Sequence, residues 1–319
     1  MPSAAIAGAG AIGAWIADAL DRAGWTVSLL ARGATLAALR SDGLRVEQGG
    51  QTRRSRPRAG SPAELGIHDY LFLTVKAQAL PELAPTLGPL IGPSTVVISG
   101  TNGIPWWFFH DFGGVLANQP LTSVDPDQSQ ERTFPRQRAL GSVVHASART
   151  CAPAHAQVVA ADRLLLGEPG GEATPRVEEV VAALRAGGVN AEVSRRIRHD
   201  VWAKLWGNMN MNPLSALTRC GTSRMLSCPE VRDLCVRMME EMQACGQILN
   251  LPMGMTPAQR IAVTQRLGDF KTSMLADLLA GRPLELAPQL GAVVEIAERL
   301  NVPAPFMRSI LGLTRLISP

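Results

Sequence analysis

The sequence predicts an α/β fold in which a doubly wound parallel sheet is followed by an all-helical C-terminal domain. A glycine-rich turn at residues 8–13 joins an apolar run to a helical pattern, and two later apolar runs look like buried parallel strands. After residue 194 the period is helical almost throughout. Because 319 residues suffice for two cores, we expect one domain at 1–194 and a helical domain at 195–319.

The composition indicates a soluble globular protein, since charged residues make up 18% and hydrophobic residues 46% of the chain. A net charge of +4 permits an anionic ligand, but the basic residues are scattered, so we expect no nucleic acid partner. No stretch is long enough to span a membrane, and no signal segment opens the chain. The five cysteines form no CxxC pair, which indicates reduced thiols in a cytoplasm and no metal site.

The first thirty residues read as strand, glycine-rich turn, helix and strand. The apolar run Ala4–Ala7 leads into the turn, helical periodicity continues to Leu20, and a second apolar run covers Thr26–Leu30. In this context the glycines allow a tight turn, close approach of a pyrophosphate, and packing of helix on strand. We therefore expect a Rossmann-type unit with the pyrophosphate at the helix N-terminus. The expected contact residues are Gly8, Ala9, Gly10, Ala11, Ile12 and Gly13.

The end of the second strand indicates which dinucleotide binds. An NAD site usually carries an acid there that accepts a hydrogen bond from the ribose 2′-hydroxyl. This chain has Leu30-Ala31-Arg32-Gly33 instead. A guanidinium at Arg32 can hold a 2′-phosphate through paired hydrogen bonds, so we expect NADP(H) as the cofactor.

Two later strands end in polar residues. The apolar run Tyr70–Val75 is followed by Lys76, and the run Thr95–Ser99 is followed closely by Asn102. Ligands bind beyond the carboxyl ends of the strands in doubly wound sheets, so both side chains are candidates to meet cofactor or substrate. The alternative for Asn102 and Gly103 is a plain turn.

Two short runs are unusual in composition. The basic run Arg53–Arg58 lies beside two glycines and contains Pro57, which favours a solvated loop. The aromatic run Trp106–Phe109 follows Pro105, a residue suited to the first turn of a helix. Four adjacent aromatics are not expected to face one core. We expect core packing for most of them, with the cofactor, the domain cleft or a subunit interface as alternatives for the rest.

The remaining pattern places the domain boundary near Ser194. Before it, short strands are expected near 141–146, 163–167 and 190–193, with an amphipathic helix at about 174–186. After it, the expected helices cover 200–217, 229–249, 257–280, 286–300 and 305–317.

The stretch 200–217 carries a polar stripe on an otherwise apolar helix. Lys204, Asn208 and Asn212 are four residues apart, which places them within an arc of ~80° and along ~12 Å of the helix axis. Polar groups in such a place are costly unless they have partners, so a ligand site is indicated. The alternative is a set of ordinary surface residues. Pro213 should kink or end the helix just after the stripe.

Two polar residues further along complete the candidates. Ser273 lies on a helix of otherwise apolar spacing, and Glu285 follows a break at Gly281 and Pro283. A carboxylate near a buried lysine keeps that lysine charged and oriented. Taken alone, Glu285 is equally a solvated residue in the first turn of a helix.

Over its whole length the chain resembles the ketopantoate reductase (2-dehydropantoate 2-reductase) family. The matching segments, in order, are GAGAIG, TVKAQ, TNG, WAKLWGNMNMNPLSAL and TSMLADLLAGRPLE. The resemblance implies an NADPH-binding Rossmann domain, an all-helical domain and an active site between them. It implies the reduction of ketopantoate to pantoate on the route to pantothenate and coenzyme A. It also permits a homodimer.

The resemblance also implies roles for individual residues. Lys204 would be the proton donor, and Asn208, Asn212 and Ser273 would hold the substrate. Asn102 would lie between substrate and nicotinamide, and Glu285 close to both. Contacts to the cofactor are implied for Lys76 and Ala146, and contact to its phosphate for Arg32.

The chain departs from the family pattern at Ala287, where an acid is usual, and at the polar position after the NPL helix, which is Thr222 here. These departures bear on the substrate. The alternatives are therefore a reductase of the same family that acts on another 2-oxo acid and, in a different class, a non-catalytic NADP(H)-binding sensor.

Overall fold

The computed structural model describes residues 1–318 and separates into two compact units. The first unit contains residues 1–101 and 127–200, and the second contains residues 102–126 and the chain from Val201 onward. This division differs from the expected single boundary at residue 194. Residues 102–126 belong with the helical part because they are bonded to it, for example from the Ile104 amide to the Pro288 carbonyl.

The first unit is built on a ten-stranded sheet whose central strands are parallel. Strand β1 lies between β2 and β6, and β7 extends the sheet beyond β6. The chain therefore builds outward in both directions from β1, which confirms the predicted doubly wound arrangement. Across the sheet the strands are β4 (Gln51–Ser55), β3 (Leu44–Gln48), β9 (His155–Gly167), β8 (Ala139–Ala152), β7 (Ile91–Ser99), β6 (His68–Leu73), β1 (Ser3–Ala7), β2 (Thr26–Leu30) and β5 (Arg58–Gly60), with β10 (Ala191–Val193) beside β9.

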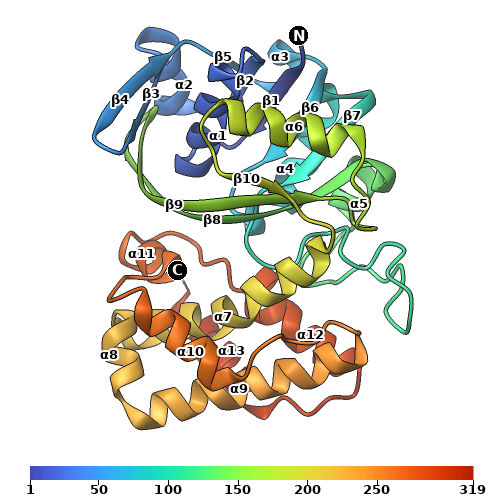
Figure 1. Cartoon of the computed structure of the whole chain (residues 1–319), viewed down its shortest axis with the longest axis vertical. Coiled ribbons are helices and arrows are strands. Elements are labelled where there is room, and N and C mark those ends of the chain that lie inside the picture. The colour runs from blue at the N-terminus through green and yellow to red at the C-terminus, as the bar shows by residue number, and fades with distance from the viewer. Residues whose placement is uncertain (319) are drawn as a thin grey trace. The chain divides into compact units, whose positions relative to one another are not determined.

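Helices cover this sheet because each turns an apolar face toward it. Helix α1 (Ala11–Arg22) buries Trp15, Ile16 and Leu20, and α6 (Pro175–Ala186) packs beside it (Figure 1). Burial of such side chains contributes about 1.5–3 kcal/mol each. The other helical segments of the first unit are α2 (Gly33–Ser41), α3 (Pro62–Leu65), η1 (Ala77–Ala79), α4 (Leu80–Leu83), η2 (Ala84–Leu90), α5 (Ser129–Thr133) and η3 (Arg136–Arg138).

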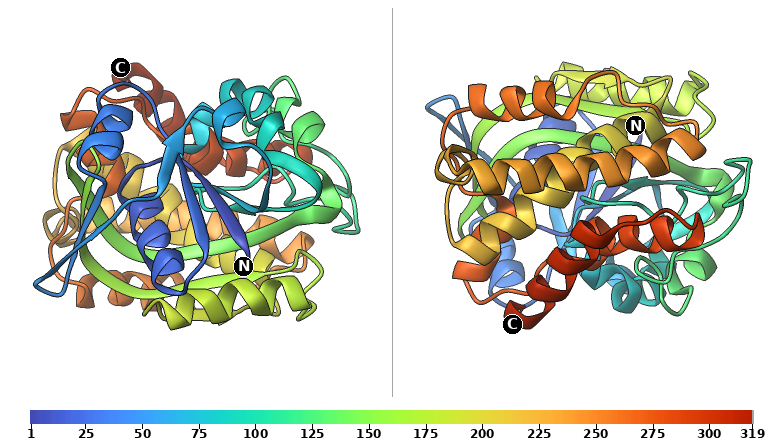
Figure 2. Two further views of the ribbon diagram at one scale, coloured as in Figure 1. Left: turned by 90° about the horizontal axis from the view of Figure 1, so that it is seen from above. Right: turned by 90° about the horizontal axis from the view of Figure 1, so that it is seen from below.

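Strands β8 and β9 form a long antiparallel hairpin, which Figure 2 shows as two curved strands running side by side. The expected strands near 141–146 and 163–167 are only parts of this hairpin. Residues 149–152 of β8 and 159–163 of β9 are exposed, so the pattern of a buried strand is missing from these parts of the sequence.

The predicted solvated loop at Arg53–Arg58 is wrong. Residues 51–55 form β4, which pairs antiparallel with β3, and residues 58–60 form β5 beside β2. Arg53 ties β4 to α1 through an ion pair with the buried Asp18 at 3.1 Å. Charged residues are common on edge strands, where they discourage pairing with other chains, and they conceal the strand in the sequence.

The second unit is organised around helix α9 (Pro229–Ile248). Several helices pack on α9 (Figure 1). The Trp206 indole of α7 donates a hydrogen bond to the Met239 carbonyl of α9 at 2.9 Å. The helical segments around it are α7 (Ile197–Thr218), α8 (Thr222–Ser227), α10 (Pro257–Arg266), α11 (Ser273–Leu279), η4 (Ala287–Gly291), α12 (Ala292–Arg299) and α13 (Pro305–Ile317). None of the helices in residues 1–318 is long and apolar enough to cross a membrane.

Three details of this unit differ from expectation. The helix predicted at 257–280 is two helices, because Gly268 adopts a φ of +77° and Thr272 caps a new helix by accepting from the Leu275 amide at 3.2 Å. The helix predicted at 286–300 begins with the π-helical segment η4. Helix α7 covers the span predicted at 200–217 and continues through Pro213, so the reading that Pro213 ends the helix is wrong. Tertiary packing of its many apolar residues outweighs one lost backbone bond.

The aromatic run Trp106–Phe109 is wholly buried. All four side chains are 5% exposed or less, so the expectation that they could not share one core is wrong. They lie in a turn and not in a helix. Because the turn itself is enclosed, side chains that point in different directions all meet apolar neighbours. Phe108, for example, stacks on Trp202 of α7 with ring centroids 6.4 Å apart.

Candidate active site

The glycine turn after β1 leaves room for no other residue at two positions. Gly8 has a φ of +122°, and a Cβ there would clash with the backbone of Thr74 and Val75. A Cβ at Gly13 would overlap the carbonyl oxygen of Gly8. The turn and the first turn of α1 are thus packed directly against the end of β6.

The N-terminus of α1 fits a pyrophosphate. Gly10 is the residue before the helix, a Cβ at Gly10 would meet nothing within 4 Å, and no side chain caps the first turn. That turn contains no acid. Its backbone N–H groups and the helix dipole therefore favour an anionic ligand. Ala9, Ala11 and Ile12 complete the turn and are partly buried.

The other cofactor candidates of the first unit lie on three different strands or their ends. Since β2 is the parallel neighbour of β1, Arg32 follows β2 at the same edge of the sheet as the glycine turn. Arg32 and Lys76 are exposed, and Lys76 follows the end of β6. Ala146 is partly buried on β8. Asn102 and Glu285, also expected near the cofactor, belong to the second unit.

Asn102, Lys204 and Glu285 are brought together within the second unit. The Lys204 Nζ donates a hydrogen bond to Asn102 Oδ1 at 2.8 Å, and Asn102 Nδ2 donates to Glu285 Oε2 at 3.4 Å. One amide therefore links an ammonium to a carboxylate, although 102 and 183 residues separate the bonded pairs. Glu285 is 3% exposed, so it is not the solvated residue that its position after a helix break allowed.

The environment of Lys204 moves its pKa toward the neutral range. Burial lowers the pKa of Lys204 to about 8, and the negative charge of Glu285 opposes that fall. The ordinary lysine value of ~10.4 would keep the ammonium charged throughout the neutral range. A lysine with a pKa near 8 can instead both hold and release a proton there, as a general acid requires.

The two asparagines of the stripe differ in their bonding. Asn208 is partly buried, and its side chain makes no hydrogen bond with residues 1–318. Asn212 is buried, and its Nδ2 donates to Oε1 of the buried Gln289 at 2.7 Å. The stripe thus presents one free amide and one amide that the neighbouring segment η4 already holds.

Ser273 lies apart from these contacts in the chain. It is the first residue of α11, directly after the capping Thr272, and is exposed.

The two departures from the family pattern, Thr222 and Ala287, lie in different surroundings. Thr222 is buried and bonds through its hydroxyl to the Gly268 carbonyl at 3.2 Å, whereas Ala287 is exposed at the start of η4.

Backbone contacts hold Asn102 in position. Gly103 has a φ of +91°, and a Cβ there would overlap the Pro288 carbonyl oxygen. The Ile104 amide donates to that same oxygen at 2.9 Å. The segment that starts with Asn102 is therefore packed directly on η4, which follows Glu285.

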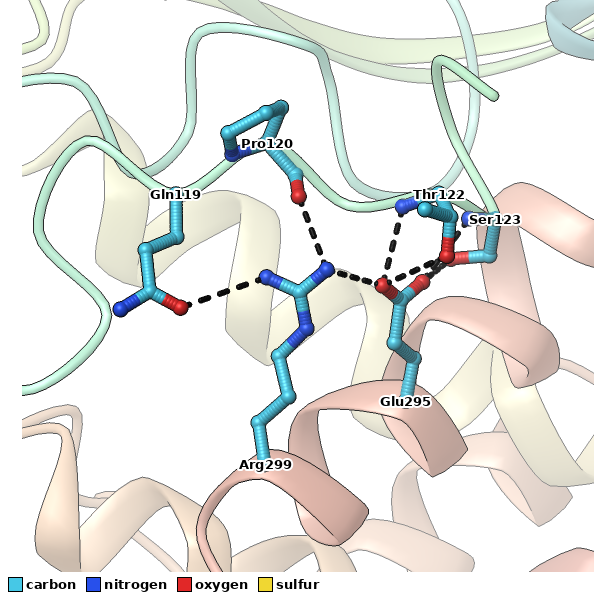
Figure 3. Close-up of polar contacts among 6 residues, drawn as sticks. All are labelled: Gln119, Pro120, Thr122, Ser123, Glu295 and Arg299. Atoms are coloured by element: carbon cyan, nitrogen blue, oxygen red, sulfur yellow. Dashed lines mark hydrogen bonds and ion pairs between the residues drawn. The ribbon is translucent and has the colours of Figure 1, made fainter. Parts of the chain in front are cut away.

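Glu295 of α12 anchors the same segment near its other end, as Figure 3 shows. Its carboxylate accepts hydrogen bonds from the amide and hydroxyl groups of Thr122 and Ser123 at 2.5–2.9 Å. Arg299 bridges the carboxylate and the Pro120 carbonyl. Burial alone would raise the pKa of Glu295, but the hydrogen bonds from Ser123 and Thr122 lower it.

Sequence reasoning missed two residues of this region. Gln289 is the single uncharged polar residue in the apolar stretch from Leu286 to Val294, and an amide in such surroundings was a usable signal. Glu295 gave none, because one acid on an amphipathic helix is ordinary.

The chain matches two family models. The model of ketopantoate reductase PanE/ApbA covers residues 4–171, and the model of its C-terminal part covers residues 196–318. A 2-dehydropantoate 2-reductase from Mesorhizobium japonicum is 38% identical over 315 residues, which is 98% of this chain and 97% of that protein.

Solved structures agree with these matches. A crystal structure of a protein assigned as a ketopantoate reductase from Ralstonia solanacearum MolK2 superposes with a TM-score of 0.94 at 41% identity, covering 99% of this chain and 98% of the other. A PanE/ApbA family ketopantoate reductase from Ralstonia eutropha JMP134 gives 0.84 at 25% identity, with the same two coverages. The chain therefore belongs to the ketopantoate reductase family of nicotinamide-dependent oxidoreductases, as its motifs implied.

Proposed function

We propose that this protein reduces the 2-oxo group of ketopantoate to give pantoate, with NADPH as the reductant. The observation that carries the proposal is the hydrogen-bonded chain of Lys204, Asn102 and Glu285 in a member of this family. NADPH, when bound, supplies the hydride that reaches the carbonyl carbon. The protein must then stabilise and protonate the carbonyl oxygen.

Lys204 protonates that oxygen. As the carbonyl carbon accepts hydride, its oxygen gathers negative charge, which a positioned ammonium stabilises and then neutralises. Asn102 accepts one of the three ammonium hydrogens at 2.8 Å and so limits the directions of the other two. Glu285 supports the charged form of the lysine, since it raises the pKa that burial lowers.

Uncharged side chains hold the substrate. The free amide of Asn208, together with Asn212 and Ser273, can bond the carboxylate and hydroxyl of a 2-oxo acid without neutralising the ammonium. The uncapped first turn of α1 supports a pyrophosphate site, and Arg32 at the same sheet edge supports a site for the 2′-phosphate. Lys76 and Ala146 would make further contacts to the cofactor.

A screen of NADPH oxidation against a panel of 2-oxo acids tests this function. Ketopantoate is expected to have the highest kcat/KM, above 2-oxoisovalerate, pyruvate and phenylpyruvate. Another preferred 2-oxo acid would keep the reaction type and overturn the substrate. Tight NADPH binding without oxidation by any acid would instead indicate a sensor.

The five cysteines are all free thiols, which supports a reducing compartment such as the cytoplasm.

A homodimer is proposed from the family resemblance alone. Sedimentation of the protein at several concentrations tests it, since a single species with the mass of one chain would contradict a dimer.

A further inference from the structure

Gln289 is a buried residue whose amide is bonded at one end and unbonded at the other. Its side chain is 1% exposed, its Oε1 accepts from Asn212, and its Nε2 has no hydrogen-bond partner among residues 1–318. A buried donor without a partner destabilises a protein. An apolar side chain of similar volume would fill the same space without that cost, so packing alone does not explain an amide here.

In the structure, the bond to Gln289 engages the nitrogen end of the Asn212 amide. An asparagine amide has an acceptor oxygen and a donor nitrogen at its two ends. The nitrogen is turned to Gln289 Oε1 at 2.7 Å, which leaves Asn212 Oδ1 as the other end. That oxygen accepts no hydrogen bond from residues 1–318. Asn212 is therefore prepared to accept a hydrogen bond.

Asn212 shares one face of α7 with the proton donor. Lys204 lies eight residues before it, which corresponds to an arc of ~80° on the helix. An acceptor on that face complements a ligand group that can donate. Of the groups on a hydroxylated 2-oxo acid at neutral pH, only the hydroxyl is a donor, because the carboxylate and the carbonyl are acceptors.

We propose that Gln289 is a specificity-determining residue that acts through Asn212. It holds the Asn212 amide with Oδ1 toward the ligand, so that the site selects a 2-oxo acid with a hydroxyl donor over the same acid without one. The proposal rests on the proposed function and adds to it a residue and the group that this residue selects.

A matched pair of substrates isolates the hydroxyl. Ketopantoate is 4-hydroxy-3,3-dimethyl-2-oxobutanoate, and 3,3-dimethyl-2-oxobutanoate differs from it only by replacement of the hydroxyl with hydrogen. The measured quantity is the ratio of kcat/KM for the first acid to that for the second. One neutral hydrogen bond accounts for roughly a 3- to 10-fold change, so Gln289→Met should lower the ratio by about that factor.

A double-mutant cycle tests whether Gln289 acts through Asn212. Asn212→Ala should lower the ratio at least as far as Gln289→Met, and the double variant should show no further fall. Asn210→Ala is the matched control, since Asn210 is a buried asparagine of α7 that bonds the Trp206 carbonyl of its own helix at 3.0 Å. It should lower the melting temperature and leave the ratio unchanged.

Gln289→Leu serves as a second variant if Gln289→Met does not fold. An unchanged ratio in a folded Gln289 variant overturns the proposal, and so do independent, multiplying effects of the two substitutions. The failure of the proposed function is distinct, because it appears as absence of ketopantoate reduction by the wild-type enzyme.

Discussion

Replacing Glu285 by Gln removes the negative charge that supports the Lys204 ammonium. The substitution keeps the size of the side chain and a hydrogen-bonding oxygen for Asn102. Since Glu285 raises the pKa of Lys204, its loss should lower that pKa further below the present value of about 8. In the proposed mechanism, the lysine acts as an acid in its charged form. Reduction is therefore fast below the pKa and is lost as pH rises through it.

The size of the effect follows from general values for opposite charges. A charge within ~4–6 Å shifts a pKa by ~1–3 units, so a shift of ~1.5 units is a reasonable expectation. At pH ~7.5 the charged fraction of Lys204 would then fall from about three quarters to about one tenth. At pH ~6 it would fall only from nearly all to about three quarters. The activity loss should thus be roughly 8-fold near pH 7.5 and small near pH 6.

The assay is the dependence of kcat/KM for ketopantoate on pH, which reports groups of the free enzyme. Glu298→Gln is the control, because it removes an exposed carboxylate of α12 that pairs with Arg308. In this control variant, the fall of kcat/KM at alkaline pH should match that of the wild type. If Glu285→Gln lowers kcat/KM equally at every pH, the carboxylate acts on substrate or cofactor directly and not through the charge of Lys204.

Three other changes have defined outcomes. Lys204→Ala should lower kcat by roughly 10²–10⁴ with NADPH affinity nearly intact, and near-normal turnover would exclude Lys204 as the acid. Arg32→Ala should weaken NADPH by roughly 10- to 150-fold in a fluorescence titration but hardly affect NADH, whereas equal losses would point to a role in folding. Gly103→Ala should destabilise the protein by about 1–3 kcal/mol in urea unfolding, because its φ of +91° is strained for alanine and a Cβ would overlap the Pro288 carbonyl. A stability within error of the wild type would contradict that strain.

Local patterns were sufficient to predict the core of the fold. The central strands are continuous apolar runs, and such a run predicts a buried strand without any knowledge of distant residues. The edge strand at 51–55 was missed because Arg53 pairs with Asp18, which lies far away in the chain. The break at Gly268 was missed for a related reason, since a glycine inside a helical pattern has no fixed meaning without its dihedral angle.

The candidate site was predictable in its helical part only. The spacing of Lys204, Asn208 and Asn212 gave one face of α7 from the residues alone. The family resemblance implied places for Asn102 and Glu285 near substrate and cofactor, but their hydrogen-bonded link to Lys204 was not predicted, because contacts across 102 and 183 residues have no local signature. The pKa of Lys204 could not be predicted from sequence, since it depends on how deeply the fold buries the side chain.

Because residues 102–126 belong to the second unit, truncating the chain at one position cannot separate the two units. The chain passes between the two units three times, at 101/102, 126/127 and 200/201. A fragment that ended at residue 194 would keep the buried Trp107 and Phe108 but lose α7, whose Trp202 stacks on Phe108. Such a fragment would expose a large apolar surface and tend to aggregate. The first unit could be isolated only after residues 102–126 had been replaced by a direct connection from Thr101 to Asp127.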